Sequence, residues 1–245
     1  MEQPFAYFNN NVVKTLALLE AMLGRGVKKF ILSSTAALFG TPDSLPITAD
    51  APIRPESVYG ETKYMIERSL AWLQQTQGLG YTCLRYFNVA GASHDYGEDH
   101  RPESHLIPLV LQVAQGKRDG IKIFGDDYPT ADGSCIRDYI HVRDLADAHI
   151  LALEQLQENQ AKAYNLGSGA GFSVKEIIEV CRQVTGHPIP AEVVARRLGD
   201  PAVLVADAQQ SIERLAWQPQ MPELERIVAS AWDWHQRHPQ GYGDS

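Results

Sequence analysis

The sequence predicts an α/β protein in which helices cover both faces of a parallel sheet, followed by a smaller α/β lobe. Strand-like and helix-like segments alternate at roughly thirty-residue spacing over residues 1–90, which is typical of a parallel sheet. After Asn88 the pattern changes to a loop rich in His, Asp and Gly, followed by shorter strand-like runs. With 245 residues and 44% hydrophobic content, the chain is long and apolar enough to bury a large core.

The first region, residues 1–90, is expected to form part of the parallel sheet. Apolar side chains at spacings of three and four predict an opening helix, and glycines follow it. Ser57 offers an N-cap for a second helix. The expected elements are a helix over Pro4–Leu23, a strand over Lys29–Ser33, a loop over 40–55, a helix from Ser57 to about Gln77, and a strand over Tyr81–Tyr86.

The second region, residues 91–245, is expected to form mainly the smaller lobe, with some segments returning to the sheet. Its expected helices cover Leu106–Gln115, Arg143–Leu156, Val174–Thr185, Ala208–Leu215 and Leu224–His238, and its expected strands cover Ile121–Phe124 and Ile136–Val142. Gly167, Gly169 and Gly171 are predicted to form a turn before the helix that Ser173 caps.

Charge and composition exclude several classes of partner. The net charge is -8, and no run of five like charges occurs, so neither nucleic acid nor a membrane surface is expected. No apolar stretch approaches eighteen residues, and the first residues do not resemble a signal peptide. The three widely spaced cysteines, Cys83, Cys135 and Cys181, are expected to be reduced core thiols. We therefore expect a cytoplasmic protein.

Tyr59 and Lys63 carry the main chemical signal. Their spacing of four places both side chains on one face of the helix that follows Ser57. Such a pair is weak by itself, because roughly 0.3 would arise by chance in this composition. Its context strengthens it, since the strand Lys29–Ser33 ends in a run of hydroxyl residues that extends to Thr35. Parallel sheets place active sites at such strand ends.

Histidine spacing does not indicate a metal site. His94, His100 and His105 lie among acidic residues, but their intervals match no usual zinc pattern. No metal is therefore predicted.

Several blocks together resemble the nucleotide-sugar branch of the extended short-chain dehydrogenase/reductase family, and within it the UDP-glucose 4-epimerases. The blocks are YFNVAG (86–91), RPESHLIP (101–108), FGDDYPTADGSCIRDYIHVRDLADAH (124–149), YNLGSGAGFSV (164–174) and RRLGDP (196–201). The resemblance implies a partial Rossmann-like sheet, NAD as cofactor, and interconversion of UDP-galactose and UDP-glucose through a transient 4-keto sugar.

The same resemblance implies roles for individual residues. Tyr59 is the expected acid/base, Lys63 tunes its phenol and holds the nicotinamide ribose, and Thr35 bonds to the reacting oxygen. The residues expected to contact the cofactor are Asn10, Ser33, Ser34, Tyr59, Lys63 and Tyr86. The residues expected to contact the substrate are Thr35, Phe87, Asn88, His105, Leu106, Phe124, Arg137, Tyr139, Arg197 and Asp200.

A physical condition accompanies the Tyr59 role. The pKa of a phenol is normally near 10, and it must fall by about three units if the group is to act as a base at neutral pH. A fall of that size corresponds to about 4 kcal/mol. Lys63 and the nicotinamide cation are expected to supply this stabilisation. Arg137 and Arg197 have the chemistry for bidentate contacts to a diphosphate, although Arg137 beside Asp138 also fits a surface ion pair.

The glycine-rich turn that grips a dinucleotide does not precede Pro4. We therefore expect the first βα units to be missing. Either the chain is a fragment or its start was mis-called, which we favour, or it is a genuine truncated product that cannot hold NAD alone and is inactive. Three functions stay open: a UDP-glucose 4-epimerase, another NAD-dependent nucleotide-sugar enzyme such as a UDP-GlcNAc 4-epimerase or a decarboxylase, and a non-catalytic UDP-sugar-binding protein. Dehydration is disfavoured, because Ala36 and Ala37 replace the acidic pair of dehydratases.

A homodimer through Pro4–Leu23 and Ser57–Gln77 is expected from the family.

Overall fold

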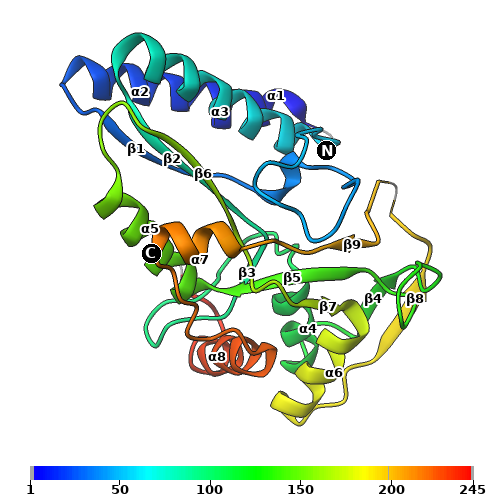
Figure 1. The fold of residues 1–245 in the computed structure, drawn as a ribbon. Helices are drawn as coiled ribbons and strands as arrows, with labels where there is room; N and C mark the ends of the chain where they lie inside the picture. The colour runs from blue at the N-terminus through cyan, green and yellow to red at the C-terminus, as the bar shows by residue number, and fades with distance from the viewer. Residues whose placement is uncertain (1–2, 198, 244–245) are drawn as a thin grey trace. The chain divides into compact units, whose positions relative to one another are not determined.

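A computed structural model describes residues 3–197 and 199–243, which divide into two compact units. The first unit contains the chain up to Phe87 together with Ala146–Gly167 and Ala206–Gln218. The second contains Asn88–Leu145, Ser168–Val205 and the chain from Pro219 onward. Both units combine helices and strands, so the predicted α/β class is confirmed (Figure 1).

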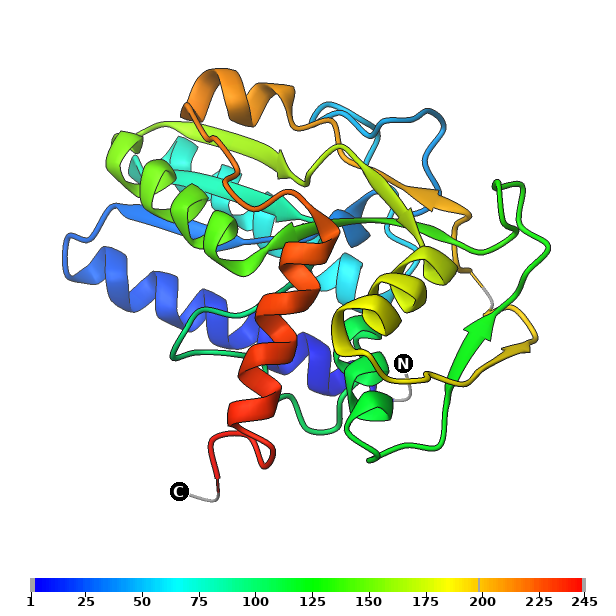
Figure 2. The ribbon, with the colours of Figure 1, turned by 90° about the horizontal axis from the view of Figure 1, so that it is seen from below.

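The first unit is built on a parallel sheet with the order β1-β2-β6. The strands are β1 (Lys29–Ser33), β2 (Gly80–Tyr86) and β6 (Ala161–Leu166). In the register, Lys29 lies opposite Gly80 and Tyr81 lies opposite Ala161. Helices α2 (Lys14–Gly24) and α3 (Val58–Gln77) cover one face, whereas α7 (Gln209–Leu215) and the part of α5 (Val142–Gln155) that belongs to this unit cover the other (Figures 1 and 2). Helices on both faces are therefore confirmed.

The N-terminal helical segment is not one regular helix. It comprises α1 (Pro4–Tyr7), a π-helical segment over Phe8–Val13, and then α2. The apolar spacing predicted the helix and its end near Gly24, but it gave no sign of the π-helical segment, because that change concerns backbone hydrogen bonding rather than the side-chain pattern.

Helix α3 has clear start and stop signals. The Ser57 hydroxyl accepts a hydrogen bond from the Gly60 amide at 3.0 Å, which confirms the predicted N-cap. Gly78 ends the helix with a φ of 71°, a left-handed conformation that glycine adopts without steric cost. Between these ends, Ile66 and Leu70 are buried against α2, β1 and β2. This packing fixes which face of α3 points away from the core.

The second unit contains a sheet and a separate strand pair. Its sheet has β3 (Asn88–Ala90), β5 (Ile136–His141), β7 (Gly171–Ser173) and β9 (Val203–Leu204), with β5 paired to the other three. Strands β4 (Ile121–Phe124) and β8 (Ala191–Val194) form a parallel pair of their own. Helices α4 (Leu106–Ala114), α6 (Val174–Thr185) and α8 (Leu224–Arg237) enclose an apolar core that includes Ile107, Leu111, Ile177 and Ile227.

The glycine-rich turn after β6 is held by a buried carboxylate. Asp138 is fully buried, and it accepts hydrogen bonds from the Ser168 amide and hydroxyl, both at 2.7 Å, and from the Gly169 amide at 3.1 Å. The following helix, α6, begins with a capping box between Ser173 and Glu176. This turn is therefore structural, as its sequence predicts.

Two general expectations concern membranes and thiols. Within the described parts of the chain, none of the helices combines the length and the apolarity needed to cross a bilayer. Cys83, Cys135 and Cys181 are all buried and free of disulfides, which confirms the expectation of reduced core thiols.

Candidate active site and ligand pocket

The first unit gathers Thr35, Tyr59 and Lys63 where strand β1 ends. Thr35 follows that strand in extended conformation and caps a short 3-10 turn, Ala36–Leu38. Tyr59 lies in the first turn of α3, and Lys63 follows one turn later. The Thr35 hydroxyl hydrogen-bonds to the Tyr59 phenol, and the Lys63 ammonium donates to the Ser33 carbonyl at 2.9 Å. The chain therefore brings together the three residues predicted to be catalytic.

Glycine at position 60 allows this close approach. A Cβ atom built on Gly60 would lie 2.4 Å from the carbonyl oxygen of Ala37, which is far below a normal contact. The first turn of α3 can therefore pack against the backbone next to Thr35 only because residue 60 has no side chain. Gly60 directly follows Tyr59 in the sequence, but the spacing of the reactive side chains gives no sign of this close backbone contact.

Protein groups alone do not lower the pKa of Tyr59. Burial raises it, the nearby Tyr86 raises it further, and the hydrogen bond with Thr35 lowers it, with a net rise above the usual value. The Lys63 ammonium lies 5.8 Å from the centre of the Tyr59 ring, and burial lowers the pKa of Lys63 itself. The expectation that Lys63 and the nicotinamide cation together lower the pKa of Tyr59 concerns the chain with its cofactor, and it stays a prediction.

A pH titration that follows the NMR signals of the tyrosine ring carbons should measure the pKa of Tyr59. In the chain without cofactor, the Tyr59 phenol should stay protonated to above pH 10, because burial disfavours the phenolate. Thr35→Val should raise the midpoint further, since it removes the hydrogen bond that stabilises the phenolate, whereas Tyr86→Phe should lower it. NMR of ¹³C-labelled tyrosine, with Tyr59→Phe for assignment, measures these midpoints. A midpoint well below pH 10 in the unliganded chain would contradict the expectation.

Ser34 does not point toward the same polar edge. Its side chain is fully buried, and its hydroxyl donates to Glu67 at 2.6 Å. Glu67 also accepts from two nitrogens of Arg85, Nε at 3.1 Å and a terminal nitrogen at 2.6 Å. Alternation along the strand end turns Ser34 inward, between Ser33 and Thr35. The prediction that the Ser34 side chain contacts a cofactor therefore does not agree with its position, and we assign this residue to the buried network with Glu67 and Arg85.

Of the other residues predicted to contact the cofactor, Ser33 and Tyr86 lie near His149, whereas Asn10 is exposed. The Ser33 hydroxyl lies 2.9 Å from Nε2 of His149, and the His149 ring lies 6.5 Å from that of Tyr86. Asn10 is exposed, and its side chain accepts a hydrogen bond from Lys14 at 2.7 Å. His149 was not singled out from the sequence, even though it ends the block that carries the strongest resemblance.

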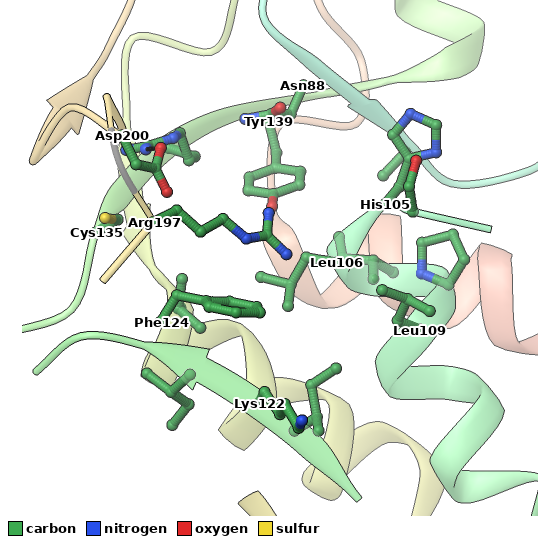
Figure 3. Close-up of a pocket in the computed structure, with 18 of the residues that line it drawn as sticks. Asn88, His105, Leu106, Leu109, Lys122, Phe124, Cys135, Tyr139, Arg197 and Asp200 are labelled. Atoms are coloured by element: carbon green, nitrogen blue, oxygen red, sulfur yellow. Dashed lines mark hydrogen bonds and ion pairs between the residues drawn. The ribbon is translucent and has the colours of Figure 1, made fainter. Parts of the chain in front are cut away.

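The second unit contains a cavity of about 400 Å³, shown in Figure 3. Its lining includes eight of the residues predicted to contact the substrate: Asn88, His105, Leu106, Phe124, Arg137, Tyr139, Arg197 and Asp200. They come from β3, the N-cap and first residue of α4, β4, β5 and the segment before β9. Phe87 is buried at the end of the first unit, and its amide donates to the Leu166 carbonyl at 3.1 Å.

The two arginines of this cavity have different environments. Arg137 forms an ion pair with Asp200, so its charge is already matched. The interpretation of Arg137 and Asp138 as a surface ion pair is wrong, because Asp138 is buried and holds the glycine-rich turn. The guanidinium of Arg197 lies 3.8 Å from the centre of the Phe124 ring, and the described residues offer it no carboxylate partner (Figure 3). Arg197 thus presents a stacked cation toward the cavity.

His105 faces two carboxylates at the start of α4. Its Nδ1 lies 2.7 Å from Glu98 and 2.9 Å from Glu103. The hydrogen bond with Glu98, together with the charges of both carboxylates, raises the pKa of His105 to about 9 despite partial burial. In the unliganded chain, His105 is therefore cationic at neutral pH.

Lys122 also lines the cavity but was not predicted. In strand β4, Ile121 and Ile123 are buried, whereas Lys122 and Phe124 point to the opposite face. The period of two along IKIF places Lys122 beside Phe124, so the alternation of the strand could have identified it.

Comparisons with known proteins agree with this arrangement. Residues 1–167 match the family model described as the NAD dependent epimerase/dehydratase family. A UDP-glucose 4-epimerase of Halalkalibacterium halodurans is 57% identical, over 99% of this chain and 73% of the relative. The corresponding enzyme of Streptococcus mutans is 52% identical, over 100% of this chain and 74% of the relative.

Solved structures show the same similarity to UDP-glucose 4-epimerases. A crystal structure of a UDP-glucose 4-epimerase superposes with a TM-score of 0.95 at 54% identity, covering 100% of this chain and 75% of that one. The UDP-glucose 4-epimerase of Bifidobacterium longum, solved in complex with NAD+ and UDP, superposes with a TM-score of 0.94 at 37% identity, covering 98% of this chain and 73% of that one.

Proposed function

Because the chain belongs to the NAD-dependent epimerase/dehydratase family, we propose that it acts as a UDP-glucose 4-epimerase, interconverting UDP-galactose and UDP-glucose. The observation that carries this proposal is the contact of Tyr59 with Thr35 in the first unit, next to Lys63. A phenol and a hydroxyl in hydrogen-bond contact can take a proton from a sugar hydroxyl and return it.

We assign Tyr59 as the acid/base at O4 of the hexose, with Thr35 holding the same oxygen. Removal of the O4 proton accompanies oxidation at C4, and its return accompanies reduction of the 4-keto sugar. When bound, NAD supplies the hydride acceptor and donor at C4. Burial and Tyr86 raise the pKa of Tyr59 in the chain without cofactor, so the positive charge of the bound cofactor would be needed to favour the phenolate.

The polar edge of the first unit suits the nicotinamide end of the cofactor. Among the described residues, the Lys63 ammonium has one hydrogen-bond partner, the Ser33 carbonyl. Two of its three N–H groups are then available for ribose hydroxyls. The Ser33 hydroxyl and the Tyr86 ring lie on the same edge, beside His149. We propose these groups as the nicotinamide-side contacts.

We propose that the cavity of the second unit holds the UDP part of the substrate. Phe124 offers an aromatic face for the uracil, and Arg197 offers a guanidinium for the diphosphate. Arg137, fixed by Asp200, would orient the neighbouring phosphate oxygens. Asn88, Leu106 and Tyr139 would complete the walls. The volume of about 400 Å³ lies within the range of small-ligand sites.

Arg197→Ala is expected to weaken UDP binding by about tenfold to a hundredfold, because it removes charge-assisted hydrogen bonds worth about 1.5–3 kcal/mol. Isothermal titration with UDP measures the loss. Arg196→Ala is the matched control, since Arg196 also stacks on an aromatic ring, that of Tyr128, but pairs with Asp127 and does not line the cavity. Equal losses in both variants would remove Arg197 from the site.

The epimerase assignment is tested by following the conversion of UDP-galactose to UDP-glucose with and without added NAD. The chain should be assayed beside a chimera that adds the part of the Halalkalibacterium halodurans relative that the chain does not cover. Turnover that depends on NAD, in either protein, supports the proposal. Binding of UDP and NAD by the chimera without interconversion would overturn it and favour a different sugar-nucleotide reaction or binding alone.

We also propose that the protein is a cytoplasmic homodimer. Exposed apolar side chains gather on the N-terminal helices and α3, including Phe5, Leu16, Leu18, Met65 and Trp72. An apolar surface of this kind supports pairing of two copies through these helices. Three free, buried thiols support a reducing compartment.

A further inference from the structure

The loop that leads into α4 gathers four side chains of the kind that hold metal ions. Glu98, His100, Glu103 and His105 each offer a ligand atom, and these atoms all lie within 4.8 Å of one another. All four belong to one stretch of eight residues, spaced E-x-H-x-x-E-x-H. The sequence predicts no metal because the intervals between His94, His100 and His105 match no usual zinc pattern. The path of the loop, rather than the spacing, brings the four groups together.

The separations fit a single small ion. Nδ1 of His105 lies 2.7 Å from Glu98 and 2.9 Å from Glu103, and Nδ1 of His100 lies 4.0 Å from Glu103. In a tetrahedral zinc site with bonds of about 2.0–2.1 Å, the ligand atoms are roughly 3.3 Å apart. The observed separations lie on both sides of that value. Side-chain shifts of about 1 Å or less would therefore bring these atoms into coordination distance.

The charges and exposures are also suitable. An ion bound here would displace the proton that His105 shares with the two carboxylates. Two carboxylates with two neutral imidazoles then carry two negative charges, which match one divalent cation. The Glu103 side chain is only 5% exposed, and its Oε1 accepts the amides of Ser104 and His105 at 2.6 and 2.7 Å, so this ligand is held in place. His100 and His105 are about half exposed, which gives an ion access. Imidazole and carboxylate together suit zinc and its transition-metal neighbours.

A neighbouring cavity borders three of these ligands. Glu98, His100 and Glu103 line a cavity of about 440 Å³. A hydrated ion and its remaining water ligands therefore have space beside the four side chains.

We propose that the loop 98–105 binds one divalent transition-metal ion, with zinc as the natural choice, through Glu98, His100, Glu103 and His105. The inference is independent of the proposed enzymatic activity. Because His105 also lines the cavity assigned to UDP, an ion here would hold that residue of the cavity wall in place.

Titration of the purified, metal-free chain with zinc tests the proposal. We expect one ion per chain with a dissociation constant on the order of 1 µM or lower. Glu98→Gln and His100→Asn should each weaken binding by about tenfold or more. His94→Asn is the matched control, because His94 is an exposed histidine that pairs with one carboxylate, Asp95, and it should change nothing.

Circular dichroism of each variant guards against misfolding, and the double variant of Glu98 and His100 should lose the stoichiometric site while keeping its spectrum. The absence of stoichiometric binding to the parent chain would overturn the proposal. Stoichiometric binding that neither Glu98→Gln nor His100→Asn weakens would overturn it as well, because the ion would then lie elsewhere.

Discussion

Tyr59→Phe is expected to reduce the turnover of UDP-galactose by about 10² to 10⁴, the contribution typical of general acid–base catalysis. The change removes only the phenolic oxygen, which in this chain hydrogen-bonds to Thr35. The ring of Tyr59 also makes an edge contact with Tyr7, with centroids 6.4 Å apart, and Phe can preserve it. The loss should therefore fall on the turnover number, while UDP affinity stays unchanged, since the proposed UDP contacts lie on other residues.

The matched control for this change is Tyr64→Phe. Tyr64 belongs to the same helix, α3, and its ring lies under the Arg68 guanidinium at 5.9 Å. It should leave turnover within about twofold of the parent protein. Initial rates and UDP affinities of both variants, measured in whichever form of the protein is active with NAD, separate the two effects. Near-parental turnover in Tyr59→Phe would mean that another group moves the O4 proton.

Glu67→Ala is expected to destabilise the protein by about 3–5 kcal/mol. Glu67 and Arg85 form a buried ion pair in which each side chain is 8% exposed. Arg85 also donates to the Ala49 carbonyl at 2.9 Å, and Ser34 donates to Glu67. Without the carboxylate, Arg85 becomes a buried, unpaired charge, and the Ser34 hydroxyl loses its acceptor. Urea unfolding followed by circular dichroism measures the change.

Two further variants complete this experiment. Glu20→Ala removes an exposed carboxylate from α2 and should change the free energy of unfolding by no more than about 0.5 kcal/mol. The double change Glu67→Ala with Arg85→Ala should lower the free energy of unfolding by less than the sum of the two single changes. Each single change leaves a buried charge without its partner, whereas the double change removes both charges. If Glu67→Ala lowered the free energy of unfolding by less than about 1 kcal/mol, the Glu67–Arg85 pair would not be a main source of stability in the first unit.

Local sequence patterns predicted the elements that position the catalytic residues. The apolar run Lys29–Ser33 is β1, and the helix capped by Ser57 is α3. Spacing within one helix is fixed by backbone geometry, so Tyr59 and Lys63 share a face. The short strands β3, β7, β8 and β9 were not predicted, since segments of two to four residues show too little periodicity.

The sequence by itself therefore determined the α/β class, the family resemblance, and the residues that carry the proposed chemistry. The tertiary structure decided which neighbours these residues have. Strand pleating turns Arg137 and Asp138 to opposite sides, so Arg137 pairs with Asp200 instead of its sequence neighbour. Ser34 is buried and its hydroxyl donates to Glu67, and the path of one loop places the His100 ring near the His105 ring. Each of these partnerships depends on contacts distant along the chain or on the course of the backbone, neither of which a residue spacing contains.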